Sequence, residues 1–189
     1  ESAKSNQVPM HPLRVVKELN DIVDDNTYFA VEPCIASVTA LAFMKQKFSG
    51  RRFVSNYSHG ALGYTIPACL ALATAHPEAT VIGIDGDGSF HFSCGELETF
   101  ARYNINAKVI LFRNDAFGWI KGETCHVYHS PFFASDFGGV NYCGVASAFG
   151  FKTFKIEKPQ DIKTTLKEAL SFRGPALIEV SVPDESQLV

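Results

Sequence analysis

Two short apolar runs constrain the fold of this chain more than any other feature. Residues 79–85 read ATVIGID and residues 107–114 read AKVILFRN, and hydrophobic side chains fill most of both runs. A strand with one face in solvent alternates apolar and polar residues, whereas a strand buried on both faces does not. The two runs therefore predict interior strands of a parallel sheet that is covered by helices on both faces.

The segments around these runs fit the same architecture. Strands alternate with helices along the chain, which predicts an α/β fold with a doubly wound parallel β-sheet. Ligands of such sheets bind beyond the carboxyl ends of the strands, so residues 32–35, 58–63, 85–89 and 114–118 are the places to look for a site. We expect further strands at 27–31, 51–57, 151–156 and 176–182, helices at 12–25, 34–48, 66–76, 94–104 and 159–172, and a long loop after residue 114.

Length and composition narrow the class of protein. A chain of 189 residues suits one domain, with residues 13–189 forming it and the polar, proline-punctuated residues 1–12 serving as a linker or tail. The net charge of −3 and the scattered basic residues do not indicate a nucleic-acid-binding surface. No apolar run approaches the roughly 18 residues of a membrane span. Five cysteines without a C-x-x-C pair fit a reducing, cytoplasmic setting better than a disulfide framework.

The stretch IDGDGSF, residues 84–90, can be interpreted as a calcium loop. Asp85 and Asp87 then take the first and third positions of an EF-hand. The sixth position of that loop requires glycine for its sharp turn, and Phe90 stands there. A helix should also precede the loop, but the preceding residues are β-branched and apolar, so the calcium interpretation fails.

A second interpretation makes the same stretch a metal and phosphate site. Gly86 and Gly88 allow a tight turn at the strand end, and Asp87 offers a hard oxygen ligand beside Ser89 and the amides that open the next helix, where phosphate is favoured. Mg²⁺ needs a second ligand, and Asn114 follows the neighbouring predicted strand 27 positions later. Either residue alone would be an ordinary turn residue. Together, at matched strand ends, they favour a Mg²⁺ site.

The pattern GDGS…RNDAFG resembles the diphosphate-binding (PP) domain of thiamine diphosphate-dependent enzymes. That family carries G-D-G, some 26 residues, and then N-N or a close variant, and here Arg113 replaces the usual first Asn. The resemblance implies thiamine diphosphate and Mg²⁺ as cofactors. It implies that Asp87, Asn114 and the backbone carbonyl of Ala116 hold Mg²⁺, while Gly86, Gly88, Ser89 and Asn114 bind the cofactor.

The resemblance covers nearly the whole chain. SHGALGYTIPACLALA, residues 58–73, is similar to the family segment that precedes the motif. By that likeness Leu62 is the apolar wedge under the cofactor and the backbone of Gly60 faces its aminopyrimidine; the alternative for Leu62 is a plain core leucine. AFGWIKGE, residues 116–123, is most similar to the corresponding loop of acetolactate synthases and pyruvate oxidases.

This likeness implies an enzyme that decarboxylates a 2-oxo acid such as pyruvate and ligates the enamine to an acceptor, as acetolactate synthases do. Simple decarboxylation, or a PP subunit of a split decarboxylase, remains open. A rival class is a non-catalytic Mg²⁺-nucleotide module, although G-x-G-x-x-G and G-K-[ST] signatures are absent from the sequence. The family's catalytic glutamate belongs to a PYR domain, so we expect this chain alone to be incomplete and its sites to lie between subunits, in a homo-oligomer.

Further residues are candidates for the substrate side. Glu32 follows the first predicted strand, and His59 and His126 lie in predicted loops where a histidine could shuttle protons or stand idle in solvent. CHVYH, residues 125–129, offers Cys125, His126 and His129 to zinc, but no second pair completes four ligands.

Overall fold

A single parallel sheet organises the computed structural model, which describes residues 1–45, 50–131 and 133–184. Its strand order is β2-β1-β3-β4-β6-β5 and every pairing is parallel. The predicted doubly wound α/β fold is therefore confirmed. The strands are β1 Thr27–Val31, β2 Phe53–Ser55, β3 Thr80–Gly86, β4 Ala107–Arg113, β5 Lys152–Ile156 and β6 Ala176–Ser181.

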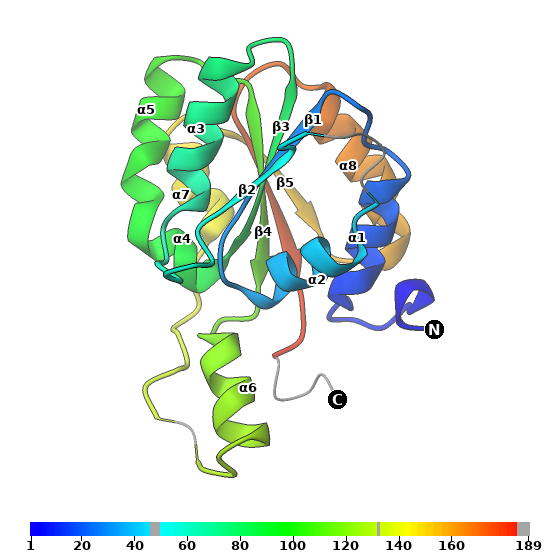
Figure 1. The fold of residues 1–189 in the computed structure, drawn as a ribbon, viewed down its shortest axis with the longest axis vertical. Coiled ribbons are helices and arrows are strands. Elements are labelled where there is room, and N and C mark those ends of the chain that lie inside the picture. Colours follow the sequence, from blue (N-terminus) through cyan, green and yellow to red (C-terminus); the bar gives the residue numbers. More distant parts are fainter. Residues whose placement is uncertain (46–49, 132, 185–189) are drawn as a thin grey trace.

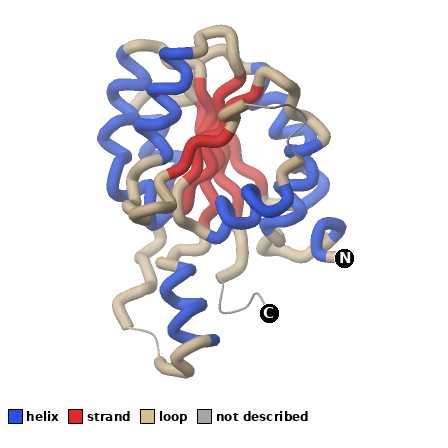
Figure 2. Tube along the Cα trace, viewed as in Figure 1, coloured by secondary structure: helices blue, strands red, loops and turns tan. Residues whose placement is uncertain are grey.

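Helices form a layer on each face of this sheet (Figures 1 and 2). One layer holds α1 Pro12–Asn20, α2 Ile35–Phe43 and α8 Ile162–Ser171, and the other holds α3 Thr65–Ala75, α5 Leu97–Arg102 and α7 Tyr142–Ala148. α4 Asp87–Ser93 continues directly from β3, and α6 Gly118–His126 projects from the sheet's carboxyl edge. Short 3₁₀ turns lie at Ser2–Lys4, Cys94–Glu96 and Pro159–Asp161.

The strands bury both faces because their side chains alternate with a period of two. Ile82 and Ile84 of β3 belong to the apolar cluster under α1, α2 and α8, whereas Val81 belongs to the cluster under α3, α5 and α7. Gly83 also faces α3, since an added Cβ there would meet Cys69 and Thr65. The central strands thus pack on both sides, which is why their sequences are almost continuously apolar.

Most predicted elements appear within a few residues of their expected bounds, but one prediction is wrong. The segment after residue 114 contains helix α6, not only a loop. Its sequence, GWIKGETCH, has two glycines and leaves Trp119 and Ile120 exposed, so it shows no amphipathic pattern that could have revealed a helix. The helix predicted at 34–48 ends at Phe43, and its positions 46–48 lie outside the described residues.

The first residues of the chain pack against the domain. Met10 is fully buried, and its backbone N–H donates to the Ser181 carbonyl over 2.9 Å. The expected role of residues 1–12 as a linker stays a prediction.

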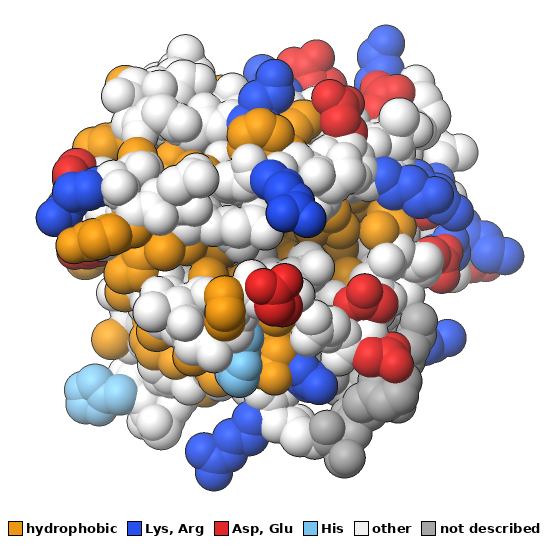
Figure 3. Space-filling model, turned by 90° about the horizontal axis from the view of Figure 1, so that it is seen from above, with side chains coloured by type: hydrophobic (Ala, Val, Ile, Leu, Met, Phe, Trp, Pro, Cys, Tyr) orange, Lys and Arg blue, Asp and Glu red, His pale blue; other side chains and the backbone are white. Residues whose placement is uncertain are grey.

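No helix among the described residues combines the length and hydropathy that crossing a bilayer requires. On the face drawn in Figure 3, basic and acidic side chains are interspersed and do not gather by sign.

Candidate functional site

A cavity of about 280 Å³ opens at the carboxyl ends of the strands. Its wall comes from segments far apart in the chain, including Pro33 and Cys34 after β1, and Gly86 and Asp87 at the end of β3. The strand order reverses between β1 and β3, and such a switch point is where doubly wound sheets bind ligands. The location predicted from the strand ends is where the cavity lies.

Asp87, the first residue of α4, is buried at the edge of this cavity. Its carboxylate accepts three backbone N–H groups: Gly88 at 2.9 Å on Oδ1, and Asn114 at 3.0 Å and Asp115 at 2.6 Å on Oδ2. Burial raises the pKa of Asp87 to about 6, against the lowering effect of these bonds. Ionised, the two oxygens offer about four acceptor positions, so Oδ1 retains one for a ligand.

The loop after β4 brings Asn114 and Ala116 to the same place. Asn114 Oδ1 accepts the Ala116 N–H over 3.2 Å, and both residues line the cavity. Ala116 pairs with Asp136 in an isolated antiparallel bridge, in which Phe117 N donates to the Ser135 carbonyl and Phe137 N donates to the Asp115 carbonyl. Both hydrogen bonds of the bridge are made by the residues that flank Ala116, so the Ala116 carbonyl oxygen accepts neither of them.

Glycine is required at position 88 because two aromatic rings close over it. A Cβ there would lie 2.9 Å from Phe117 Cδ1, a distance that real Cβ atoms essentially never show, and 3.2 Å from Phe137 Cζ, which is tighter than most Cβ contacts. At Gly86 a Cβ would lie 3.3 Å from the Cβ of Cys34. Both glycines and the buried Ser89 line the cavity, so the backbone itself forms its floor.

Gly60 and Leu62 also line the cavity, and their predicted contact with a cofactor stays a prediction. Gly60 has a φ of 69°, a left-handed conformation that glycine adopts without strain. Leu62 is half-buried and so is not a plain core leucine. Ser89 Oγ accepts the Gly63 N–H over 3.1 Å, which ties this wall to the α4 side of the cavity.

Glu32 is placed beneath the cavity, and it is not among the residues that line it. It is fully buried, and its Oε2 accepts the Tyr64 N–H. Burial and the adjacent Glu32 carboxyl raise the pKa of Asp85 well above its ordinary value. Glu32 thus links the end of β1 to the start of α3, a role that the strand-end pattern could not reveal.

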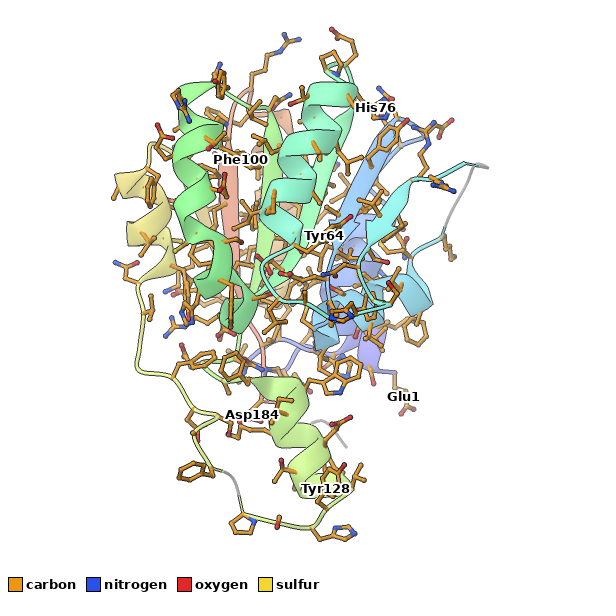
Figure 4. All side chains as sticks on the ribbon, turned by 60° about the vertical axis from the view of Figure 1, so that its left-hand side comes forward. Glu1, Tyr64, His76, Phe100, Tyr128 and Asp184 are labelled. Carbon is orange, nitrogen blue, oxygen red and sulfur yellow. The ribbon has the colours of Figure 1, made fainter. Side chains whose placement is uncertain are left out.

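The two histidines lie outside the cavity lining. His59 and His126 are both exposed. His126 ends α6, whose far end is marked by Tyr128 in Figure 4, away from the sheet. Among the described residues no group of three or more His, Cys, Asp and Glu could hold a metal ion, so the zinc interpretation of residues 125–129 finds no support. The five cysteines are free.

Several lining residues escaped the sequence reasoning. Cys34 faces Gly86, and its thiol contacts Ser37 Oγ at 3.0 Å. Burial raises the pKa of this thiol to about 12, so it stays neutral. Its position after the first strand was the available signal. Lining residues outside the four ranges expected from the strand ends are Pro12, Ala36, Phe112, Trp119, Ile120 and Val182.

Comparison with known proteins identifies the group to which this site belongs. The model of the family "Thiamine pyrophosphate enzyme, C-terminal TPP binding domain" matches residues 35–180. One similar protein is a probable acetolactate synthase large subunit of Methanococcus aeolicus, which is 30% identical over 97% of this chain and 31% of its own length. Another is the acetolactate synthase large subunit of Porphyra purpurea, which is 28% identical over 92% of this chain and 29% of its own length.

The Escherichia coli K12 acetolactate synthase isozyme 1 large subunit is 26% identical over 95% of this chain and 32% of its own length. The chain thus spans about a third of the length of these relatives. The family match covers well over half of the chain, along the sheet and cavity described above. The resemblance drawn from the GDG motif is confirmed: this chain belongs to the C-terminal TPP-binding domain family of thiamine pyrophosphate enzymes.

Proposed function

We propose that this chain is the diphosphate- and Mg²⁺-binding domain of an enzyme that decarboxylates a 2-oxo acid such as pyruvate and joins the product to an acceptor. The observation that carries the proposal is the buried Asp87 carboxylate beside Asn114 and Ala116, at the switch point of a sheet in a thiamine pyrophosphate-binding family. The acetolactate synthase relatives support the carboligase reaction over simple decarboxylation.

The donor set fits a Mg²⁺ ion. A carboxylate oxygen of Asp87, the amide oxygen of Asn114 and the carbonyl of Ala116 are all hard oxygen ligands, which this cation prefers. At neutral pH Asp87 is ionised despite its burial, because its pKa of about 6 lies below 7. Both properties support Asp87 as a ligand.

The cavity also fits the organic cofactor. In the proposal the cofactor diphosphate lies on the backbone of Gly86, Gly88 and Ser89, where a side chain at position 88 would collide with Phe117. Leu62 supports the rings and Gly60 approaches the aminopyrimidine. When bound, thiamine diphosphate supplies the electron sink for decarboxylation.

The chain's own contribution is binding, orientation and exclusion of water. Apolar side chains, among them Leu62, Phe117 and Ile120, line most of the wall. An apolar wall lowers the local dielectric and keeps water away from the reacting carbon. We infer that a PYR domain, on a longer polypeptide or a partner subunit, supplies the glutamate that the pyrimidine needs. Homo-oligomeric assembly and a cytoplasmic location belong to the same proposal.

Calorimetric titration with thiamine diphosphate tests the cofactor assignment. The full protein, with its PYR domain present, should bind thiamine diphosphate in Mg²⁺ and lose most of that affinity in EDTA. Asp87→Ala should remove Mg²⁺-dependent binding, whereas Asp21→Ala, at an exposed residue of the C-cap of α1, should not change it. Binding of Mg²⁺-ADP in preference to thiamine diphosphate would instead support a nucleotide module.

Turnover assays test the reaction. With the PYR domain present, pyruvate should be consumed and a carboligated product should accumulate. The 189-residue chain alone should turn over no 2-oxo acid. Release of free aldehyde as the main product would favour a decarboxylase, and turnover by the isolated chain would refute the need for a PYR domain.

A further inference from the structure

Arg113 occupies the position at which the family usually has the first Asn of its N-N pair, and its contacts are unlike those of an amide. It is the last residue of β4. Its Nε donates to both oxygens of Asp115, at 2.9 and 3.1 Å, and its Nη1 donates to Glu179 Oε1 at 3.3 Å. The guanidinium therefore joins β6, which carries Glu179, to the loop that carries Asn114.

The anchor on β6 is rigid. Glu179 lies within the central part of β6, and its side chain is only 3% exposed. Lys155 of β5 approaches the same carboxylate at 4.0 Å and pairs more closely with Glu157 at 3.0 Å. An Arg fork that satisfies two carboxylates at once has a fixed orientation, which a flexible lysine would not provide.

The loop that Arg113 holds is in an unusual backbone conformation. Asp115 has a φ of 55°, in the left-handed region that non-glycine residues seldom occupy. In this conformation the consecutive amides of Asn114 and Asp115 both point at Asp87 Oδ2. Aspartate enters this region more readily than most residues, and the Arg113 salt bridge holds the Asp115 side chain while it does so.

The same salt bridge engages a carboxylate that would otherwise compete for the cation. Asp115 is adjacent to Asn114 and carries a carboxylate, which would attract a cation more strongly than the Asn114 amide does. Both of its oxygens instead accept N–H from Arg113. The positive charge of Arg113 beside the Asp115 carboxylate disfavours a second cation there, whereas Asp87 and Asn114 line the cavity.

We propose that Arg113 is a positioning residue, which through Asp115 and Glu179 holds the Asn114–Ala116 loop in the geometry that receives a divalent cation. This inference rests on the proposed function, because it assigns to Arg113 a role at the same Mg²⁺ site. Partners that orient metal ligands from outside the coordination sphere commonly contribute about 10- to 100-fold to metal affinity.

The test compares Arg113→Gln, Asp115→Asn and the double variant. Each is assayed in the full protein for Mg²⁺ affinity at saturating thiamine diphosphate. Each single variant should weaken Mg²⁺ binding by about tenfold. The double variant should be no weaker than either single variant, since both remove one interaction. Thiamine diphosphate affinity at saturating Mg²⁺ should change little.

Two further variants separate positioning from a general loss of stability. Arg113→Gln leaves the buried Glu179 without its arginine, so Arg113→Gln/Glu179→Gln removes both charges and should still weaken Mg²⁺ binding. Lys155→Gln removes the other cation near Glu179 without touching Asp115, and should bind Mg²⁺ as the parent does. Mg²⁺ affinity within twofold of the parent in both Arg113 variants, or additive losses in the double variant, would overturn the assignment.

Hydrogen exchange, measured without cofactor on peptides covering residues 113–117, makes failure of this inference distinguishable from failure of the proposed function. Slow exchange at the Asn114 and Asp115 amides should become fast in Arg113→Gln. If the parent binds Mg²⁺ but exchange is unchanged in the variant, the positioning role is wrong. If the parent binds no Mg²⁺, the proposed function is wrong, and with it the cation role of Arg113, whatever the exchange shows.

Discussion

Replacing Gly83 by alanine should destabilise the protein strongly, although it adds only one methyl group. Gly83 lies in the middle of β3, between β1 and β4. Its added Cβ would lie 2.7 Å from Cys69 Sγ and 2.8 Å from Thr65 Cγ2, where 3.4–4 Å is ordinary contact. Both partners are fully buried in α3, so neither can move into solvent.

The magnitude follows from these distances. Overpacking a tight core costs about 1–3 kcal/mol, and two contacts against a strand fixed on both sides place Gly83→Ala at about 3 kcal/mol. For a chain of this size each kcal/mol lowers Tm by about 2–4 °C, so we expect a fall of about 6–12 °C. Gly95→Ala is the matched control, because a Cβ at Gly95 meets nothing within 4 Å.

Thermal unfolding followed by circular dichroism, with urea unfolding for the free energies, measures the effect. Removing the obstructing atoms should restore stability. The loss of unfolding free energy in Gly83→Ala/Cys69→Ala should be about 1 kcal/mol smaller than the sum of the losses in the two single variants, because the two sites are in contact. Thr65→Ser, which removes Cγ2, should add to this recovery. A Gly83→Ala protein that unfolds at the temperature of Gly95→Ala, or strictly additive double variants, would refute the packing argument.

Two more predictions concern a buried lysine and the cavity wall. Burial lowers the pKa of Lys108 from 10.5 to about 8, so between these values the folded chain binds fewer protons than the unfolded chain. The free energy of unfolding should therefore rise as pH increases from about 8 to 10.5, and this gain is lost as pH drops to 8. Lys108→Met should remove this pH dependence, measured by urea titrations at several pH values. Leu62→Ala should weaken thiamine diphosphate binding by about 5- to 30-fold, equivalent to about 1–2 kcal/mol, with little change in Tm because Leu62 is only half-buried; equal calorimetric affinities would remove its proposed role.

The sheet was predictable because burial on both faces leaves a plain sequence signal. The runs at 79–85 and 107–114 are apolar for the reason that β3 and β4 pack against two helix layers, and both strands appear there. α6 was not predictable in the same way. It projects from the body and has no apolar stripe facing the sheet, so the period of its sequence carries no information about burial.

The site was predictable in its location and only partly in its contacts. Asp87 and Asn114 follow adjacent parallel strands, so sequence spacing alone brings them together at one edge. Two of the three amides that hold Asp87, those of Asn114 and Asp115, depend on the left-handed backbone of Asp115, which no side-chain pattern specifies. The Glu32–Asp85 pair depends on strand register across β1 and β3, where Asp85 follows Ile84, the partner of Val31.

The bridge between Ala116 and Asp136 has a consequence for how such a protein can diverge. After the Asn114–Ala116 loop the chain runs outward at Phe117 and returns at Ser135, and the bridge between Ala116 and Asp136 closes this excursion. Lys121 of α6 reinforces the closure through Asp136 and Asp184, which lies beside the base of α6 in Figure 4. Beyond Lys121, changes of length or sequence within the excursion would leave the bridge and its lysine contacts in place. If the proposed function holds, changes in that part of the chain are a route by which substrate preference can diverge while the proposed cofactor-binding residues stay the same.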